Sequence, residues 1–105
     1  MKNHYDTLIE AINNKLLVRV CFMAKEKGMI TRLCVPYDFG PSSRNKDGQN
    51  RFHFKDLDSP DVTHPLSILP EQIHSIETTA ESFNPKDYVT WKPNWKVKRD
   101  WGIYS

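Results

Sequence analysis

The spacing of apolar side chains changes once along the chain, and this change limits the possible folds more than any other feature. In the first part, apolar residues recur every three or four positions, the spacing of one helix face, at Tyr5, Leu8, Ile9, Ile12 and Leu16. From Val18 onward they recur at every second position, as on one face of a β-strand. The sequence therefore predicts one amphipathic helix, from Tyr5 to Asn14, followed by strands and turns.

Asparagines at both ends set the limits of this helix. The side chain of Asn3 can accept a backbone N–H of the first turn, and Asp6 stands where a weak capping box has its acidic residue. At the other end, Asn13 and Asn14 suit the left-handed geometry of a helix C-cap. The helix is therefore expected to stop at Asn14.

Two segments with alternating apolar residues, joined by a glycine-containing turn, predict a β-hairpin. Residues 25–28 form the turn, and a loop of this length would pair Ala24 with Met29. In that register the apolar residues of the two strands face each other in pairs, Val18 with Val35 and Val20 with Leu33. A slip of one residue would move every side chain to the other face.

The same register would gather two arginines and two cysteines on the opposite face of the hairpin: Arg19, Cys21, Arg32 and Cys34. Guanidinium groups in such a patch could hold a phosphate through bidentate hydrogen bonds, and the alternative is an ordinary solvated face. The two thiols would be diagonal neighbours, too far apart for a relaxed disulfide. Because the chain has no other cysteine, both are expected to be free thiols.

Shorter strands and turns are expected in the rest of the chain. These are a polar, basic loop at 40–50, strands at 51–55, 66–68 and 73–79, and helical turns at 70–72 and 85–87. The predicted fold is mainly β (α+β), with an N-terminal helix and a small, strongly bent five-stranded antiparallel sheet or barrel. The chain of 105 residues is expected to be a single domain, 1–105, in which a Trp- and Lys-rich extension, 81–105, packs on the barrel.

Composition and charge narrow the classes of function. The chain has no apolar run of about 18 residues and no signal-peptide pattern, so a cytoplasmic protein without a membrane partner is expected. The net charge is only +2, but residues 25–55 and 88–105 are basic and an acidic segment, 56–87, separates them. This layout allows a one-sided basic surface. The basic loop adds Arg44, Lys46 and Arg51 to the candidate phosphate ligands.

Three tryptophans alternate with basic residues near the C-terminus, at Trp91, Trp95 and Trp101. Such interleaving suits single-stranded nucleic acid, in which case Trp91 and Trp95 would stack on bases while the cations contact phosphates. The alternative, favoured by the small size of the domain, is that the rings fold back and close its core. The sequence leaves both interpretations open.

Five short motifs follow one another in a recognisable order: Leu-Ile-Glu-Ala-Ile at 8–12, Leu-Val-Arg-Val-Cys-Phe at 17–22, Arg-Leu-Cys-Val-Pro-Tyr at 32–37, Leu-Pro-Glu-Gln-Ile at 69–73 and Phe-Asn-Pro at 83–85. This order resembles the WYL domain, a ligand-sensing module with a small Sm-like barrel found in bacterial transcription regulators and defence-associated proteins. The resemblance covers roughly residues 8–85, although the Trp-Tyr-Leu tripeptide of the family is absent. It implies a nucleic-acid or nucleotide ligand held by basic residues, among them Arg32.

Nothing in the sequence indicates catalysis. No serine or cysteine lies in a nucleophile motif, no glycine-rich phosphate loop is present, and the four histidines lack metal-ligand spacing. The sequence predicts a non-catalytic ligand-sensing or adaptor module, without metal or cofactor, that binds nucleic acid or a nucleotide. Its phosphate contacts would come from Arg32, Arg19, Arg44, Lys46 and Arg51. The first alternative is a protein–protein interaction module, in which the chain pairs with a partner protein or forms a homodimer and has no nucleic-acid ligand. A small hydrolase or nuclease is the third hypothesis and ranks last.

Overall fold

The computed structural model describes residues 2–59 and 65–105. This part of the chain contains one α-helix, α1 (His4–Asn14), and five strands: β1 (Leu16–Ala24), β2 (Gly28–Pro41), β3 (Asn50–Asp56), β4 (Leu66–Ile68) and β5 (Ile73–Ser82). There are also three 3-10 turns: η1 (Pro70–Gln72) between β4 and β5, and η2 (Pro85–Asp87) and η3 (Gly102–Tyr104) after β5. The predicted mainly β (α+β) fold, with one N-terminal helix, is confirmed.

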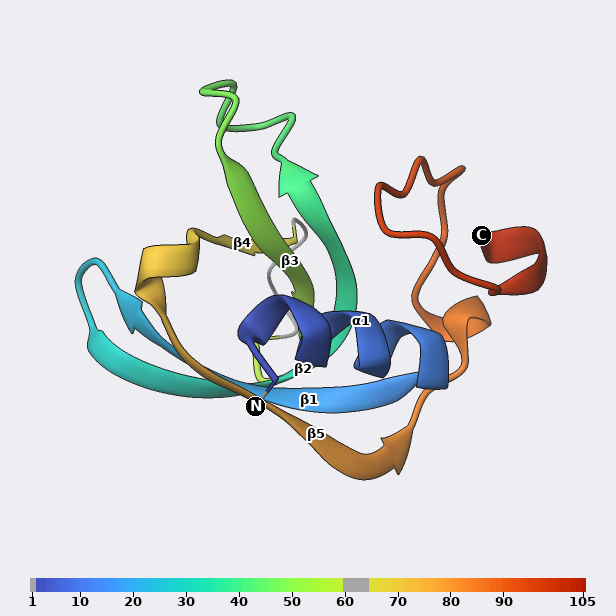
Figure 1. Cartoon of the computed structure of the whole chain (residues 1–105), viewed down its shortest axis with the longest axis horizontal. Helices are drawn as coiled ribbons and strands as arrows, with labels where there is room; N and C mark the ends of the chain where they lie inside the picture. Colours follow the sequence, from blue (N-terminus) through green and yellow to red (C-terminus); the bar gives the residue numbers. More distant parts are fainter. Residues whose placement is uncertain (1, 60–64) are drawn as a thin grey trace.

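The strands form one antiparallel sheet in the order β4-β3-β2-β1-β5. The sheet bends strongly but is not closed into a barrel, because β4 and β5 remain its two edges (Figure 1). Of the two architectures that the sequence left open, the bent sheet is therefore the correct one.

Helix α1 lies across the curved sheet, above β1 and β2 (Figure 1), and buries Leu8, Ala11 and Ile12 against it. At its start the side chain of Asn3 accepts the Asp6 N–H at 2.8 Å, as predicted. At its end the left-handed residue is Lys15, with φ of 55°, and not one of the preceding asparagines.

The hairpin of β1 and β2 forms, but its predicted register is wrong by one residue. Gly28 pairs with Ala24, so three residues rather than four lie in the loop. The φ of Gly28 is 72°, and glycine in this left-handed position is typical of three-residue hairpin loops. As a result, Val18 lies opposite Cys34 instead of Val35.

The observed register separates the four residues that were expected to share one face. Arg32 and Cys34 lie on the core side of the hairpin, whereas Arg19 and Cys21 lie on its outer side. The predicted patch of two arginines is therefore wrong, and so is the placing of both cysteines on one face. Alternation along β2 was misleading because residues 34–38 are all buried, so this part of the strand has no solvated face.

The two thiols are free, as predicted, but they differ in accessibility. Cys34 is fully buried, and burial, together with the charges of Asp56 and Asp58, raises the pKa of its thiol far above the usual range. Cys21 is partly exposed on the outer face. Because the thiolate is the reactive form, the folded protein should react with iodoacetamide at Cys21 alone, and at Cys34 only after unfolding. Peptide mass spectrometry measures both sites, and modification of Cys34 in the folded protein would contradict the prediction.

The segment 83–105 packs against the helix and the sheet through buried side chains that include Phe83, Val89, Val97 and Trp101. The indole Nε1 of Trp101 donates a hydrogen bond to the carbonyl oxygen of Ile12, at 2.9 Å, and so ties this segment to the end of α1. Trp91, in contrast, stays 46% exposed. The two interpretations of the tryptophans thus apply to different residues, because Trp101 belongs to the core and Trp91 to the surface.

Candidate functional site

An irregularity in β2 builds the first wall of the candidate site. The pairing of β2 with β3 shifts between Pro36 and Asp38, so Tyr37 has no partner in that ladder. Proline cannot donate to the ladder, and a bulge of this kind re-aims the side chain next to it. The ring of Tyr37 contacts those of Trp91 and Trp95, with centroid distances of 5.6 Å in each case.

We call these three rings, Tyr37, Trp91 and Trp95, the aromatic cluster. The two indole rings also contact each other, with centroids 5.9 Å apart. The Tyr37 hydroxyl donates to the carbonyl oxygen of Tyr88, and burial raises the pKa of Tyr37 to about 12, so the phenol stays neutral. Tyr37 is buried and anchors the cluster in the domain, whereas Trp91 is half exposed and leaves one side of the cluster open to solvent.

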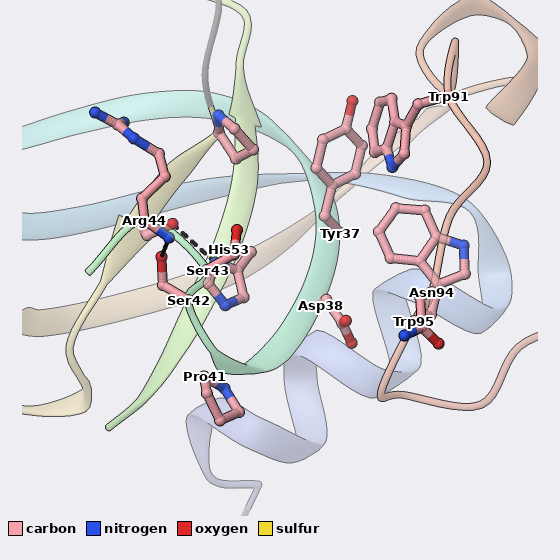
Figure 2. Close-up of a pocket in the computed structure, with 12 residues that line it drawn as sticks. Tyr37, Asp38, Pro41, Ser42, Ser43, Arg44, His53, Trp91, Asn94 and Trp95 are labelled. Atoms are coloured by element: carbon pink, nitrogen blue, oxygen red, sulfur yellow. Dashed lines mark hydrogen bonds between the residues drawn. The ribbon is translucent and has the colours of Figure 1, made fainter. Parts of the chain in front are cut away.

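A cavity of about 190 Å³ separates the aromatic cluster from the loop of residues 42–49. Figure 2 shows the three rings on one side of it, with Pro41, Ser42 and His53 on the other. The side chain of Arg44 leaves the loop at the rim and extends away from the rings (Figure 2). The cavity therefore has an aromatic wall, a polar wall and a cation at its edge.

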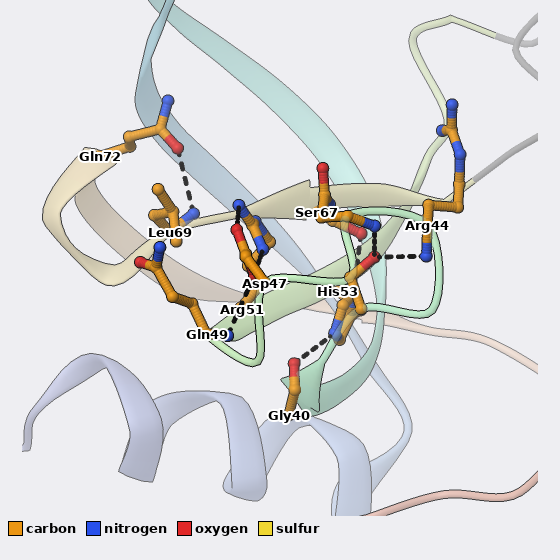
Figure 3. A network of polar contacts seen from close by, with 11 residues as sticks. Gly40, Arg44, Asp47, Gln49, Arg51, His53, Ser67, Leu69 and Gln72 are labelled. Carbon is orange, nitrogen blue, oxygen red and sulfur yellow. Dashed lines mark hydrogen bonds and ion pairs between the residues drawn. The ribbon is translucent and has the colours of Figure 1, made fainter.

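The polar wall comes from three adjacent strands. Asp38 of β2, His53 of β3 and Ser67 of β4 are direct cross-strand partners, so the three side chains form one row on the same face of the sheet. His53 sits in the middle, with Nδ1 at 2.8 Å from Ser67 Oγ and Nε2 at 2.8 Å from the carbonyl oxygen of Gly40 (Figure 3). Both ring nitrogens are thus held by hydrogen bonds.

Asp38 fixes the aromatic wall to the sheet. Its carboxylate accepts the backbone N–H groups of Lys96 and Val97, at 2.9 and 2.8 Å, and pairs with Arg99 at 3.3 Å. The guanidinium of Arg99 lies between the rings of Trp95 and Trp101, at 4.1 and 4.5 Å from their centroids. Burial lowers the pKa of Arg99 to about 10, although the charge of Asp38 opposes this shift.

Three of the predicted basic residues lie in the loop 42–49 or just after it, and they differ in their surroundings. Arg51 is buried and donates two hydrogen bonds of 2.9 Å to Asp47 (Figure 3), and these bonds lower the pKa of Asp47 to about 2. Arg44 and Lys46 are exposed. Arg44 and Lys46 of the loop are therefore open to solvent, whereas Arg51 holds the loop in place through Asp47.

The remaining predicted phosphate ligands lie away from this cavity. Arg32 borders a second cavity, of about 350 Å³, beside the β1–β2 turn, and its Nε is 3.5 Å from a carboxylate oxygen of Asp56. Arg19 is exposed on the outer face, directly across from Glu77 of β5. Of the residues proposed from the sequence as phosphate or base contacts, Arg44, Trp91 and Trp95 line this cavity.

Sequence reasoning missed four residues of the site: Tyr37, Asp38, His53 and Ser67. Three of them meet only through the pairing of β2, β3 and β4, and no local motif signals that pairing. The one local signal is Pro36, since a proline inside a strand marks an edge or a bulge. It could have indicated that the side chains after it are re-aimed.

Fold and site together define an α+β domain with an open antiparallel sheet and, beside the β2–β3 loop, a cavity with one aromatic wall. Comparison with protein-family models, curated proteins and solved structures gives no match. Within residues 2–59 and 65–105, no group of three His, Cys, Asp or Glu side chains is placed to hold a metal ion. Within the same ranges, no helix has the length and apolar character needed to cross a membrane.

Proposed function

We propose that this chain is a ligand-binding module that takes a nucleotide, free or within single-stranded nucleic acid, in the cavity beside the aromatic cluster. The observation that carries the proposal is the position of Trp91, a large ring that is 46% exposed at the cavity and backed by two other aromatic rings. Bases stack on such rings whatever their sequence, because every base has a π face.

The size and charge of the cavity support the same ligand. At about 190 Å³ it is smaller than the roughly 300–1,000 Å³ of pockets that enclose a drug-sized molecule, so it suits one ring system. Sugar and phosphate would then remain at the rim, where Arg44 is exposed, and Lys46 is exposed two residues further along the same loop. A guanidinium and an ammonium are the side-chain groups that most often contact phosphate.

This proposal changes the binding surface expected from the sequence. The outer hairpin face would have used Arg19 and Arg32, which lie on opposite sides of the sheet. The resemblance to WYL domains suits a sensor or adaptor role in transcription regulation. In such a role the cavity would hold the ligand that is sensed.

Trp91→Ala is expected to weaken binding of adenosine monophosphate and of a short fluorescent oligothymidylate about tenfold. The reason is that a base stacked on an aromatic ring contributes about 1–3 kcal/mol, and tenfold corresponds to about 1.4 kcal/mol. Arg44→Gln should reduce the salt dependence of oligonucleotide binding by roughly 0.7 in the slope of log K against log salt, the contribution of one phosphate contact. Fluorescence anisotropy titrations at several salt concentrations measure both effects.

The matched control is Arg19→Gln, which removes the same charge from the outer face and should leave both affinity and salt slope unchanged. The proposal is wrong if the wild-type chain binds neither probe at low salt. It is also wrong if Trp91→Ala binds both probes as tightly as the wild type does.

A further inference from the structure

The row of Asp38, His53 and Ser67 lines the same cavity, and the proposed nucleotide binding uses neither His53 nor Ser67. We propose that Ser67 is a nucleophile activated by His53, and that it acts on aryl esters of small carboxylic acids. This inference goes beyond the binding function and departs from the sequence-based expectation that the chain is not an enzyme. It rests on the hydrogen bonds of His53, on the position of Asp38 and on the nature of the opposite wall.

The hydrogen bonds of His53 determine which ring nitrogen is the base. Nε2 lies 2.8 Å from the carbonyl oxygen of Gly40, and because a carbonyl only accepts, Nε2 carries the hydrogen. In the neutral imidazole, Nδ1 is then the acceptor, so the Ser67 hydroxyl donates to it across 2.8 Å. Nucleophile, base and orienting acceptor therefore stand in the order that nucleophilic catalysis requires (Figure 3).

Asp38 is not the group that orients the ring, because its carboxylate is held by the N–H groups of Lys96 and Val97 and by Arg99. It is nevertheless the direct cross-strand partner of His53, and such partners have Cβ atoms about 4.5–5.5 Å apart. When Ser67 gives up its proton, the imidazolium that forms has this anionic residue as its partner on the neighbouring strand. The Gly40 carbonyl keeps accepting from Nε2 throughout, so the ring does not turn.

The opposite wall indicates the substrate class. An aryl group would pack against Trp91 and Trp95 (Figure 2), and the ester carbonyl would face the polar wall to which Ser67 belongs. Ser67 Oγ attacks the carbonyl carbon and its proton passes to Nδ1; the bond from the carbonyl carbon to the aryl oxygen breaks, and the aryl alcohol leaves with that proton. Water, deprotonated by Nδ1, then attacks the acyl-serine, releases the carboxylic acid and returns the proton to Oγ.

Diisopropyl fluorophosphate tests the nucleophile on the full chain without any nucleotide. Ser67 Oγ would bond to phosphorus, the P–F bond would break, and fluoride would leave while the serine proton passes through His53 to solvent. We expect one diisopropylphosphoryl group per chain, located on Ser67 by peptide mass spectrometry, and release of 4-nitrophenol from 4-nitrophenyl acetate. His53→Gln keeps a hydrogen-bonding side chain but no base, so labelling should slow about a hundredfold, within the range of about 10²–10⁴ for general base catalysis.

The control is Ser82→Ala, which removes an exposed hydroxyl at the end of β5 and should label at the wild-type rate. Label absent from Ser67 in the wild-type chain overturns the proposal, and so does His53→Gln labelling at the wild-type rate. The labelling site is read on the wild-type chain, so the first outcome does not depend on the folding of a variant. Because the assay contains no nucleotide, labelled Ser67 without nucleotide binding refutes only the proposed function, and the reverse result refutes only this inference.

Discussion

Trp101→Ala is expected to lower the free energy of unfolding by about 3–5 kcal/mol, the usual cost of removing a buried tryptophan. Trp101 is only 3% exposed. Its ring contacts the rings of Phe83 and Trp95, and the centroid of Trp101 lies 5.5 Å from the centroid of each. The variant also removes the hydrogen bond from Nε1 to the carbonyl oxygen of Ile12. Small domains are stable by about 5–15 kcal/mol in total, so the loss should be large in urea denaturation followed by circular dichroism.

Trp91→Ala is the matched control, because it removes the same atoms from a ring that is 46% exposed. Its effect on the free energy of unfolding should stay below about 1.5 kcal/mol, the energy of a surface aromatic contact. Trp101→Ala should therefore lower mainly the free energy of unfolding, whereas Trp91→Ala should lower mainly the affinity for the nucleotide probes. Equal losses of stability would mean that both rings belong to the core and would remove the basis of the proposed site.

The elements that the sequence predicts correctly are those that depend on neighbouring residues alone. The cap by Asn3, the turns that begin at Pro70 and Pro85, and the short strand 66–68 all follow from local chemistry. The hairpin register is different, because it depends on the backbone conformation of Gly28. Two loop types fit the same residues, and only one of them puts glycine in the left-handed region and in a pair with Ala24.

The candidate site was predictable only in part, for a related reason. Trp91 and Arg44 stand out in the sequence because aromatic and basic residues in turn-rich segments are typical of binding surfaces, although the exposure of Trp91 is known only from the structure. His53 and Ser67 do not stand out, since 14 positions separate them and only the pairing of β3 with β4 joins them. The bulge at Pro36 adds a second condition, because it places Asp38, and not Tyr37, across from His53. The row of Asp38, His53 and Ser67 thus depends on two strand registers, that of β2 with β3 and that of β3 with β4, and such a combination leaves no periodic pattern in the sequence.

Asp38→Ala is expected to destabilise the domain more than Arg99→Met, although the two side chains form one ion pair. Without Asp38 the Arg99 guanidinium, whose side chain is 1% exposed, has no counter-charge, and the N–H groups of Lys96 and Val97 lose their acceptor. Removing one partner of a buried pair in this way costs about 3–5 kcal/mol. The exposed change Asp87→Ala is the control and should stay within about 0.5 kcal/mol of the wild type.

Arg99→Met should cost only about 1.5–3 kcal/mol, the contribution of a hydrogen bond to a charged group. In this variant Asp38 keeps its two backbone donors, and the thioether chain of methionine fills the space between the two indole rings. The variant also removes the buried Nη1 of Arg99, which has no hydrogen-bond partner in the described structure. The double variant Asp38→Ala/Arg99→Met should be more stable than Asp38→Ala alone, because the second change removes the uncompensated cation. The interaction free energy between the two substitutions should be about 0.5–3 kcal/mol. Urea denaturation of the four proteins in this cycle measures the coupling. A double variant less stable than Asp38→Ala alone would show that Arg99 stabilises the domain through its two tryptophan rings and not through Asp38.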